Sequence, residues 1–216
     1  MTDSLIQTIA IAALPVIFAI TLHEAAHGYV ARYFGDPTAY QLGRISLNPL
    51  RHIDLWGTIV IPVLILVFSG GNFLFGYAKP VPVNFGRLRN PKRDMLWVAL
   101  AGPGANLAMA LAWAALLKLD LALPHNDYTL ALSTMAQYGV RINVVLMILN
   151  LFPLPPLDGG RVAVSLLPLR LAVPFSRLEP WGFVILLALL VSGALGAILG
   201  PIVNFVEFGI LNAVVS

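Results

Sequence analysis

Three residues capable of metal and acid–base chemistry stand together in residues 20–29, ITLHEAAHGY, which contain the pattern H-E-x-x-H. On an α-helix of about 3.6 residues per turn, His23 and His27 are four positions apart and lie on one face, with Glu24 beside them. Two imidazoles at that spacing can bind one zinc ion, and the carboxylate of Glu24 can accept a proton from water. The residue types therefore indicate metal-assisted hydrolysis, for which the rest of the chain should provide a third ligand and a place for the substrate.

The surroundings of this motif strengthen the interpretation as a metal site. A single histidine on an apolar face is commonly a structural residue, and short patterns recur by chance. Here, however, the three polar side chains interrupt residues 5–34, which are otherwise almost wholly apolar. Ionisable groups in lipid cost several kcal/mol each unless they are paired or bind a metal. A chance occurrence of the motif is therefore a poor explanation.

The composition places these residues in a membrane protein. Of the 216 residues, 59% are hydrophobic and only 11% are charged, whereas a soluble domain usually carries about 25% charged residues. The net charge of +3 does not indicate a nucleic-acid partner, because the basic residues lack interleaved aromatic side chains. The chain has no cysteine, which leaves His, Asp and Glu as zinc ligands. Residues 1–4 contain no basic residue, so we expect the first apolar segment to be retained and not cleaved as a signal peptide.

The apolar segments predict an all-α polytopic membrane protein with about four full transmembrane helices. The first covers residues 4–34 and ends at Gly35-Asp36-Pro37, and the others cover residues 94–118, 130–152 and 181–199. Residues 202–215 follow Gly200-Pro201 and form either an extra C-terminal crossing or a helix on the surface. Residues 55–68 are short for a crossing, and residues 73–85 are aromatic and proline-rich, which favours an extended, membrane-associated strand segment.

Asp158 is the candidate for the third ligand. It follows a helix broken by Pro153, Pro155 and Pro156, and two glycines after it allow a tight turn. Alone, this stretch would be an ordinary turn at a membrane surface. Together with H-E-x-x-H, it completes a set of two imidazoles and one carboxylate that leaves the fourth position of zinc open.

Three motifs in this order resemble those of the site-2 protease family of intramembrane zinc metalloproteases. They are HEAAH in the first span, AGPGAN at residues 101–106, and NLFPLPPLDGG at residues 150–160. The resemblance implies that His23, His27 and Asp158 bind one Zn²⁺ and that Glu24 is the catalytic acid and base. It also implies that Asn106 and Asn150 lie near the bound peptide, although either amide could equally serve helix packing. Larger members of the family carry PDZ-like or CBS-like domains that are not found in this sequence.

The depth of these motifs predicts the topology. H-E-x-x-H lies late in its helix and Asp158 just beyond another, so these two helices should run in the same direction, and the helix containing Asn106 should run in the opposite one. An even number of crossings must then separate Phe34 from Asp94, which predicts that residues 55–68 form a re-entrant helix with residues 73–83 as its extended arm. This topology places most of the basic residues on the active-site side, which the positive-inside rule makes cytoplasmic. Eleven of the 13 Lys and Arg residues fall there: Arg32, Arg44, Arg51, Lys79, Arg87, Arg89, Lys92, Arg93, Arg161, Arg170 and Arg177.

The resulting hypothesis is a single integral membrane protease domain over residues 1–216. It would cleave transmembrane segments of single-span membrane proteins within the bilayer of a prokaryotic cell membrane, as in regulated intramembrane proteolysis, and the extended arm would pair with the unwound substrate. The alternative is a zinc-binding membrane protein without protease activity, either a metal transporter or an inactive scaffold. A transporter needs a polar path across several helices, whereas the ionisable residues here gather at one depth.

Overall fold

The computed structural model describes residues 2–52, 54–60, 64, 79–124 and 126–215, and this part of the chain is helical without a β-strand. Four of its helices are long and apolar enough to cross a membrane: Ala10–Tyr33, Pro91–Leu121, Tyr128–Asn150 and Ala194–Val215. The predicted all-α polytopic class is confirmed. The elements are α1 (Thr2–Tyr33), α2 (Thr38–Gln41), η1 (Pro49–Arg51), η2 (Leu55–Val60), η3 (Phe85–Arg87), α4 (Pro91–Leu121), α5 (Asp127–Asn150), α6 (Asp158–Leu166), α7 (Leu169–Ser176), α8 (Glu179–Val191) and α9 (Ala194–Val215).

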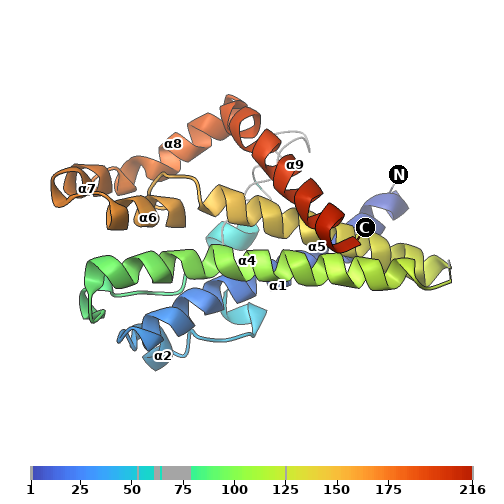
Figure 1. Cartoon of the computed structure of the whole chain (residues 1–216), viewed down its shortest axis with the longest axis horizontal. Helices are drawn as coiled ribbons and strands as arrows, with labels where there is room; N and C mark the ends of the chain where they lie inside the picture. Colours follow the sequence, from blue (N-terminus) through green and yellow to red (C-terminus); the bar gives the residue numbers. More distant parts are fainter. Residues whose placement is uncertain (1, 53, 61–63, 65–78, 125, 216) are drawn as a thin grey trace.

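Helix α4 is the central element, because it packs against α1, α5, α6 and α9 (Figure 1). Ala31 near the end of α1 packs with Val98 early in α4, whereas Ala19 is hydrogen-bonded to Asn106 further along α4. The same order of contacts relates α4 to α5, where Asn106 is hydrogen-bonded to Asn143 and Trp113, further along α4, lies against Gly139, earlier in α5. Both neighbours therefore run antiparallel to α4, and α1 and α5 run in the same direction, as the depth of the motifs predicted.

The connection between α1 and α4 lies only partly within the described residues. Residues 55–60 form one π-helical turn, η2, and residues 79–84 are neither helix nor strand. The predicted re-entrant helix over residues 55–68 and the arm over residues 73–83 extend into residues 61–63 and 65–78, which lie outside the described part. What the structure defines is the return of the chain at residues 79–84, alongside α1.

The structure corrects the predicted boundary between the last two apolar segments. We expected a span over residues 181–199 that ends before Gly200-Pro201, but α8 ends at Val191 and α9 runs from Ala194 through Pro201 to Val215. Gly193 adopts a φ of +76°, a conformation that glycine tolerates, and the chain turns there. Pro201 removes one backbone hydrogen bond without ending the helix, which transmembrane helices commonly tolerate. Residues 202–215 thus belong to a full-length candidate span.

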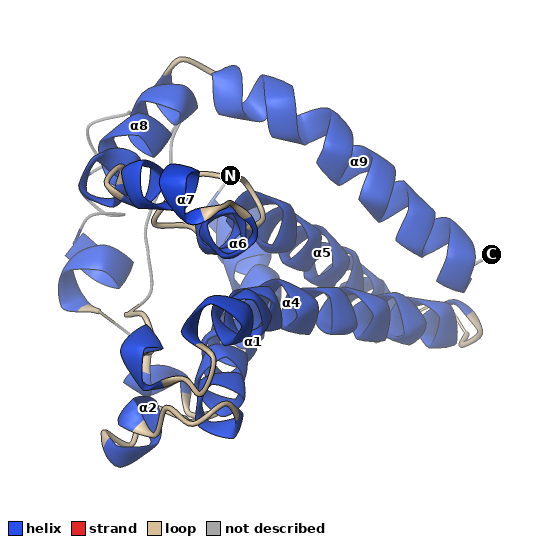
Figure 2. Cartoon of the chain, turned by 60° about the vertical axis from the view of Figure 1, so that its left-hand side comes forward, coloured by secondary structure: helices blue, strands red, loops and turns tan. Residues whose placement is uncertain are grey.

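Helix α9 returns from α8 to cover α4 and α5 (Figure 2). A buried apolar cluster joins the three helices and includes Ala110, Ala114, Val140, Val144, Val203 and Ile210. Polar contacts add to it, because Arg141 of α5 donates to Asn204 of α9 at 2.8 Å and forms an ion pair with Glu207. The guanidinium of Arg141 is therefore neutralised by a side chain of a neighbouring helix.

Candidate active site

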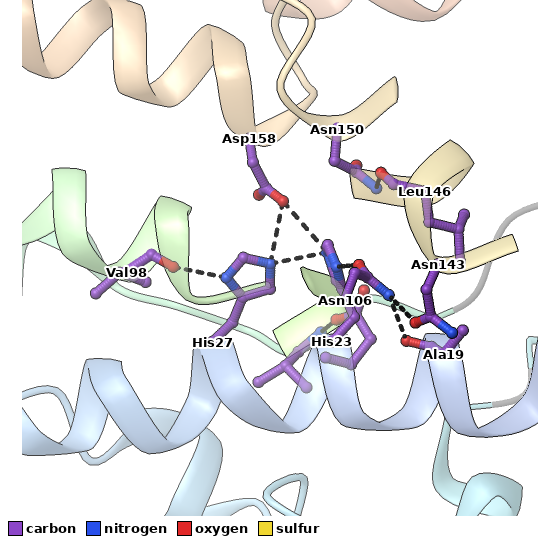
Figure 3. A network of polar contacts seen from close by, with 11 residues as sticks. Ala19, His23, His27, Val98, Asn106, Asn143, Leu146, Asn150 and Asp158 are labelled. Atoms are coloured by element: carbon purple, nitrogen blue, oxygen red, sulfur yellow. Dashed lines mark hydrogen bonds and ion pairs between the residues drawn. The ribbon is translucent and has the colours of Figure 1, made fainter. Parts of the chain in front are cut away.

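The two histidines of α1 and the first residue of α6 meet in the interior of the molecule (Figure 3). His23 and His27 are buried, and their Nε2 atoms lie 3.1 Å apart. The Oδ2 atom of Asp158 lies 3.2 Å from Nε2 of His23 and 3.3 Å from Nε2 of His27. The structure therefore brings together the three side chains that the sequence analysis selected as metal ligands, although 131 residues or more separate Asp158 from the histidines along the chain.

The hydrogen bonds behind the imidazoles define which nitrogen carries the proton. Nδ1 of His27 lies 2.7 Å from the carbonyl oxygen of Val98, which can only accept, so this nitrogen is the donor. Nδ1 of His23 lies 2.6 Å from Oδ1 of Asn106. The Asn106 amide nitrogen donates to the carbonyl of Ala19 and to Oδ1 of Asn143, so its oxygen is the atom left to accept from His23. In the neutral rings, both Nε2 lone pairs consequently face Asp158.

This arrangement fits a metal ion and is unfavourable without a cation. Two imidazole lone pairs and a carboxylate oxygen face one another, and Oδ2 of Asp158 is buried without a hydrogen-bond donor. Zinc–ligand distances of about 2.0–2.1 Å in a tetrahedron place neighbouring ligand atoms about 3.3 Å apart. The separations of 3.1 to 3.3 Å among the three ligand atoms agree with that value. His23, His27 and Asp158 thus form a group that could hold one zinc ion.

The charge of Asp158 suits the same role. Burial raises the pKa of this carboxyl, but hydrogen bonds and positive charge from His23 and His27, when their rings are protonated, lower it more, to about 2. The carboxylate is therefore ionised at neutral pH, which is the form that binds a metal.

Gly102 of α4 leaves the space in front of the two rings open. A Cβ atom at this position would lie 2.4 Å from Nε2 of His27 and 2.5 Å from Nε2 of His23, much closer than atoms can approach. At Gly104, two residues further along α4, such a Cβ atom would have no neighbour within 4 Å. The sequence analysis placed Gly102 within the AGPGAN motif, but its proximity to the histidines arises only when α1 and α4 pack.

A cavity of about 150 Å³ adjoins the three ligand candidates and is also lined by the candidate acid and base. Glu24 lines it, and Oε2 of Glu24 accepts a hydrogen bond of 2.7 Å from the backbone N–H of Val81. Pro80 and Pro82 have no N–H group, so Val81 provides the only donor of this tripeptide. The position of Val81 between two prolines was the sequence feature that could have indicated a specific role for its amide.

The two asparagines that the resemblance placed near a peptide differ in position. Asn150 lines the cavity, and its amide nitrogen donates to the carbonyl of Leu146 at 2.9 Å. Asn106 is fully buried, is not among the cavity residues, and lies behind His23 as the partner of its Nδ1 atom. Asn143, which the sequence analysis missed, supports it from α5 and is also fully buried. A polar residue in the middle of an apolar helix was the available indication.

Close backbone packing fixes the loop that carries Asp158. A Cβ atom on Gly159 would lie 2.2 Å from the carbonyl oxygen of Leu151, and one on Gly182 of α8 would lie 1.6 Å from that of Pro155. Arg161 extends from α6 toward α8, where it pairs with Glu179 at 3.2 Å. The proline-rich loop is therefore held between α6 and α8, which explains why glycines stand at these positions.

Comparison with known proteins agrees with the chemistry of the site. A model described as peptidase family M50 matches residues 124–193, which include Asn150 and Asp158. The chain is 37% identical over 194 residues to "Putative zinc metalloprotease YwhC" of Bacillus subtilis, covering 88% of this chain and 84% of that protein. It is 32% identical over 180 residues to "Putative zinc metalloprotease Rip2" of Mycolicibacterium smegmatis, covering 83% and 66% of the two chains. No solved structure matches the chain.

Proposed function

Because the chain belongs to peptidase family M50, the site-2 protease family, we propose that it is a zinc-dependent endopeptidase that cleaves transmembrane segments within the bilayer. The observation that carries the proposal is the meeting of three unprotonated ligand atoms, from His23, His27 and Asp158, beside a cavity that also contains Glu24. Two imidazoles and a carboxylate are a ligand set of catalytic zinc sites, in which one position stays open.

The proposed roles follow from the contacts of each side chain. His23, His27 and Asp158 would hold the zinc ion, whose Lewis acidity makes water more acidic and a carbonyl carbon more electrophilic. Glu24 accepts a proton from the attacking water and passes it to the leaving amine. The Val81 amide holds one oxygen of the Glu24 carboxylate, so that the other oxygen is free for this proton transfer.

The depth of the site supports a substrate within the membrane. His23 lies ten residues before the end of α1 at Tyr33, which is roughly 15 Å along the helix axis. The hydrocarbon core of a bilayer is about 30 Å thick, so a helix that spans it would carry His23 within the core and not at its surface. Single-span membrane proteins would reach it by local unwinding, and Asn150 at the cavity wall would bind the exposed peptide backbone.

The protein is an integral membrane protein with several apolar helices. We propose that residues 1–216 form one protease domain in a prokaryotic cell membrane, with the site open toward the cytoplasm. The bacterial origin of the relatives supports a prokaryotic membrane. The basic residues that follow α1 and begin α4 support a cytoplasmic position for that end of the helices.

A comparison of wild type with Glu24→Gln tests the proposal. Both proteins are purified, their zinc content is measured, and each is incorporated into vesicles with candidate single-span proteins. We expect one zinc per chain in both and a cleaved fragment from the wild type alone. Zinc movement across the vesicles that persists in Glu24→Gln would instead identify a transporter, and zinc binding without cleavage of any candidate by wild type would identify a scaffold.

A further inference from the structure

A second concave surface lies between α1 and α4, outside the residues that face the ligand candidates. This α1–α4 groove has a volume of about 580 Å³, and its walls include Tyr29, Tyr33 and Phe34 of α1 and Trp97, Leu100 and Ala101 of α4. None of its lining residues lines the active-site cavity. The groove is a separate feature, between two neighbouring helices that both figures show side by side (Figures 1 and 2).

The groove is apolar and open to its surroundings. Tyr29, Tyr33 and Trp97 are 53%, 72% and 51% exposed. Aromatic side chains with one polar end are typical of the boundary between lipid chains and headgroups. No acidic side chain is among the lining residues, and the groove has few groups to which a peptide backbone could donate or from which it could accept hydrogen bonds.

Two arginines lie at the end of the groove where α1 finishes and α4 begins. Arg89 donates to the backbone carbonyl of Tyr33 at 2.5 Å, and its guanidinium lies 6.0 Å from the centre of the Tyr33 ring. Arg93 is exposed and stands one helical turn before Trp97, on the same face of α4. The carboxylate of Asp94 in the same turn is buried and accepts from the backbone N–H of Asn90, so the exposed charge at the start of α4 is positive and includes that of Arg93.

We propose that the α1–α4 groove binds one anionic phospholipid. An acyl chain lies against Tyr29, Trp97 and Leu100, and the phosphate contacts Arg89 and Arg93. A phospholipid has its apolar and anionic parts in the same order along the membrane normal as the groove and the arginines. The orientation of the helices alone requires basic residues on one side of the membrane, but it does not require an apolar groove that ends at them.

Quenching of Trp97 by brominated lipid chains measures this binding. The full chain is incorporated into bilayers that contain either brominated phosphatidylglycerol or brominated phosphatidylcholine at the same fraction. The difference between wild type and Trp97→Phe isolates Trp97 from Trp56, Trp113 and Trp181. Each basic residue at the surface favours an anionic lipid by a factor of about five, so two arginines predict a preference of about 25-fold.

Matched variants separate a specific site from general surface charge. Arg93→Gln alone should reduce the preference several-fold without disturbing the fold, because the described residues make no hydrogen bond or ion pair with its side chain. Adding Arg89→Gln should abolish the preference. Arg170→Gln with Arg177→Gln removes the same charge from exposed positions in α7 and directly after it, which do not line the groove, and should leave the preference intact.

Three results would overturn the proposal. Equal quenching of wild type by the two lipids would mean that the groove holds any acyl chain. An equal effect of the α7 control pair would assign the preference to the net charge of the surface. Absence of Trp97 quenching by either lipid would mean that another protein segment covers the groove.

Discussion

Gly102→Ala is the sharpest test of the candidate metal centre, because it adds one methyl group directly in front of the ligand atoms. The new Cβ atom would lie 2.4 Å from Nε2 of His27 and 2.5 Å from Nε2 of His23. Ordinary contacts begin near 3.4 Å, so one helix must move by about 1 Å or the rings must turn. We expect the rings to leave the geometry that allows them to share one ion.

The magnitude follows from this displacement. Overpacking of this kind costs about 1–3 kcal/mol of stability, which leaves the protein folded. A misplacement of about 1 Å in a catalytic site reduces turnover on the order of 100-fold. Zinc binding and cleavage should therefore be lost while the thermal unfolding transition remains.

The assay combines zinc content, competition with a chelator, thermal unfolding and cleavage of a reconstituted single-span protein. Gly104→Ala, on the same helix, is the matched control, since its Cβ atom would have no neighbour within 4 Å. It should keep zinc and activity and gain up to about 1 kcal/mol, because alanine is the better helix former. Stoichiometric zinc and wild-type cleavage in Gly102→Ala would refute the assignment of the ligand set.

Two further predictions concern residues that position the site. Asn143→Leu removes the acceptor of the Asn106 amide and should weaken zinc binding about 10- to 100-fold, measured by chelator competition, while unchanged affinity would show that the Asn143–Asn106 contact serves packing alone. Gly182→Ala places a Cβ atom 1.6 Å from the carbonyl oxygen of Pro155 and should lower both activity and the unfolding temperature by displacing the loop before α6. Gly209→Ala, which meets nothing within 4 Å, should do neither, and equal effects of the two substitutions would contradict the proposed role of α8.

The sequence was most informative where chemistry depends on local geometry. Residues four apart on a helix share a face whatever surrounds them, so the pairing of His23 with His27 could be read directly. The breakage of a helix by consecutive prolines is equally local, and it drew attention to Asp158. The length of an apolar segment similarly predicted the long helices, although the break at Gly193 was missed because glycine occurs in transmembrane helices without ending them.

The tertiary structure determined everything that depends on atoms from different helices. The carbonyl of Val98 contacts His27, and the amide of Asn143 contacts Asn106 behind His23, only because α1, α4 and α5 pack side by side. No periodicity in the chain encodes that Gly102 faces the same rings or that Glu207 meets Arg141. Backbone carbonyls and glycines have no side chain whose type could reveal a function, so their roles appear only when packing brings them within about 3 Å of a partner. The sequence by itself thus determined which chemistry is available, and the fold decided its orientation and its access to space.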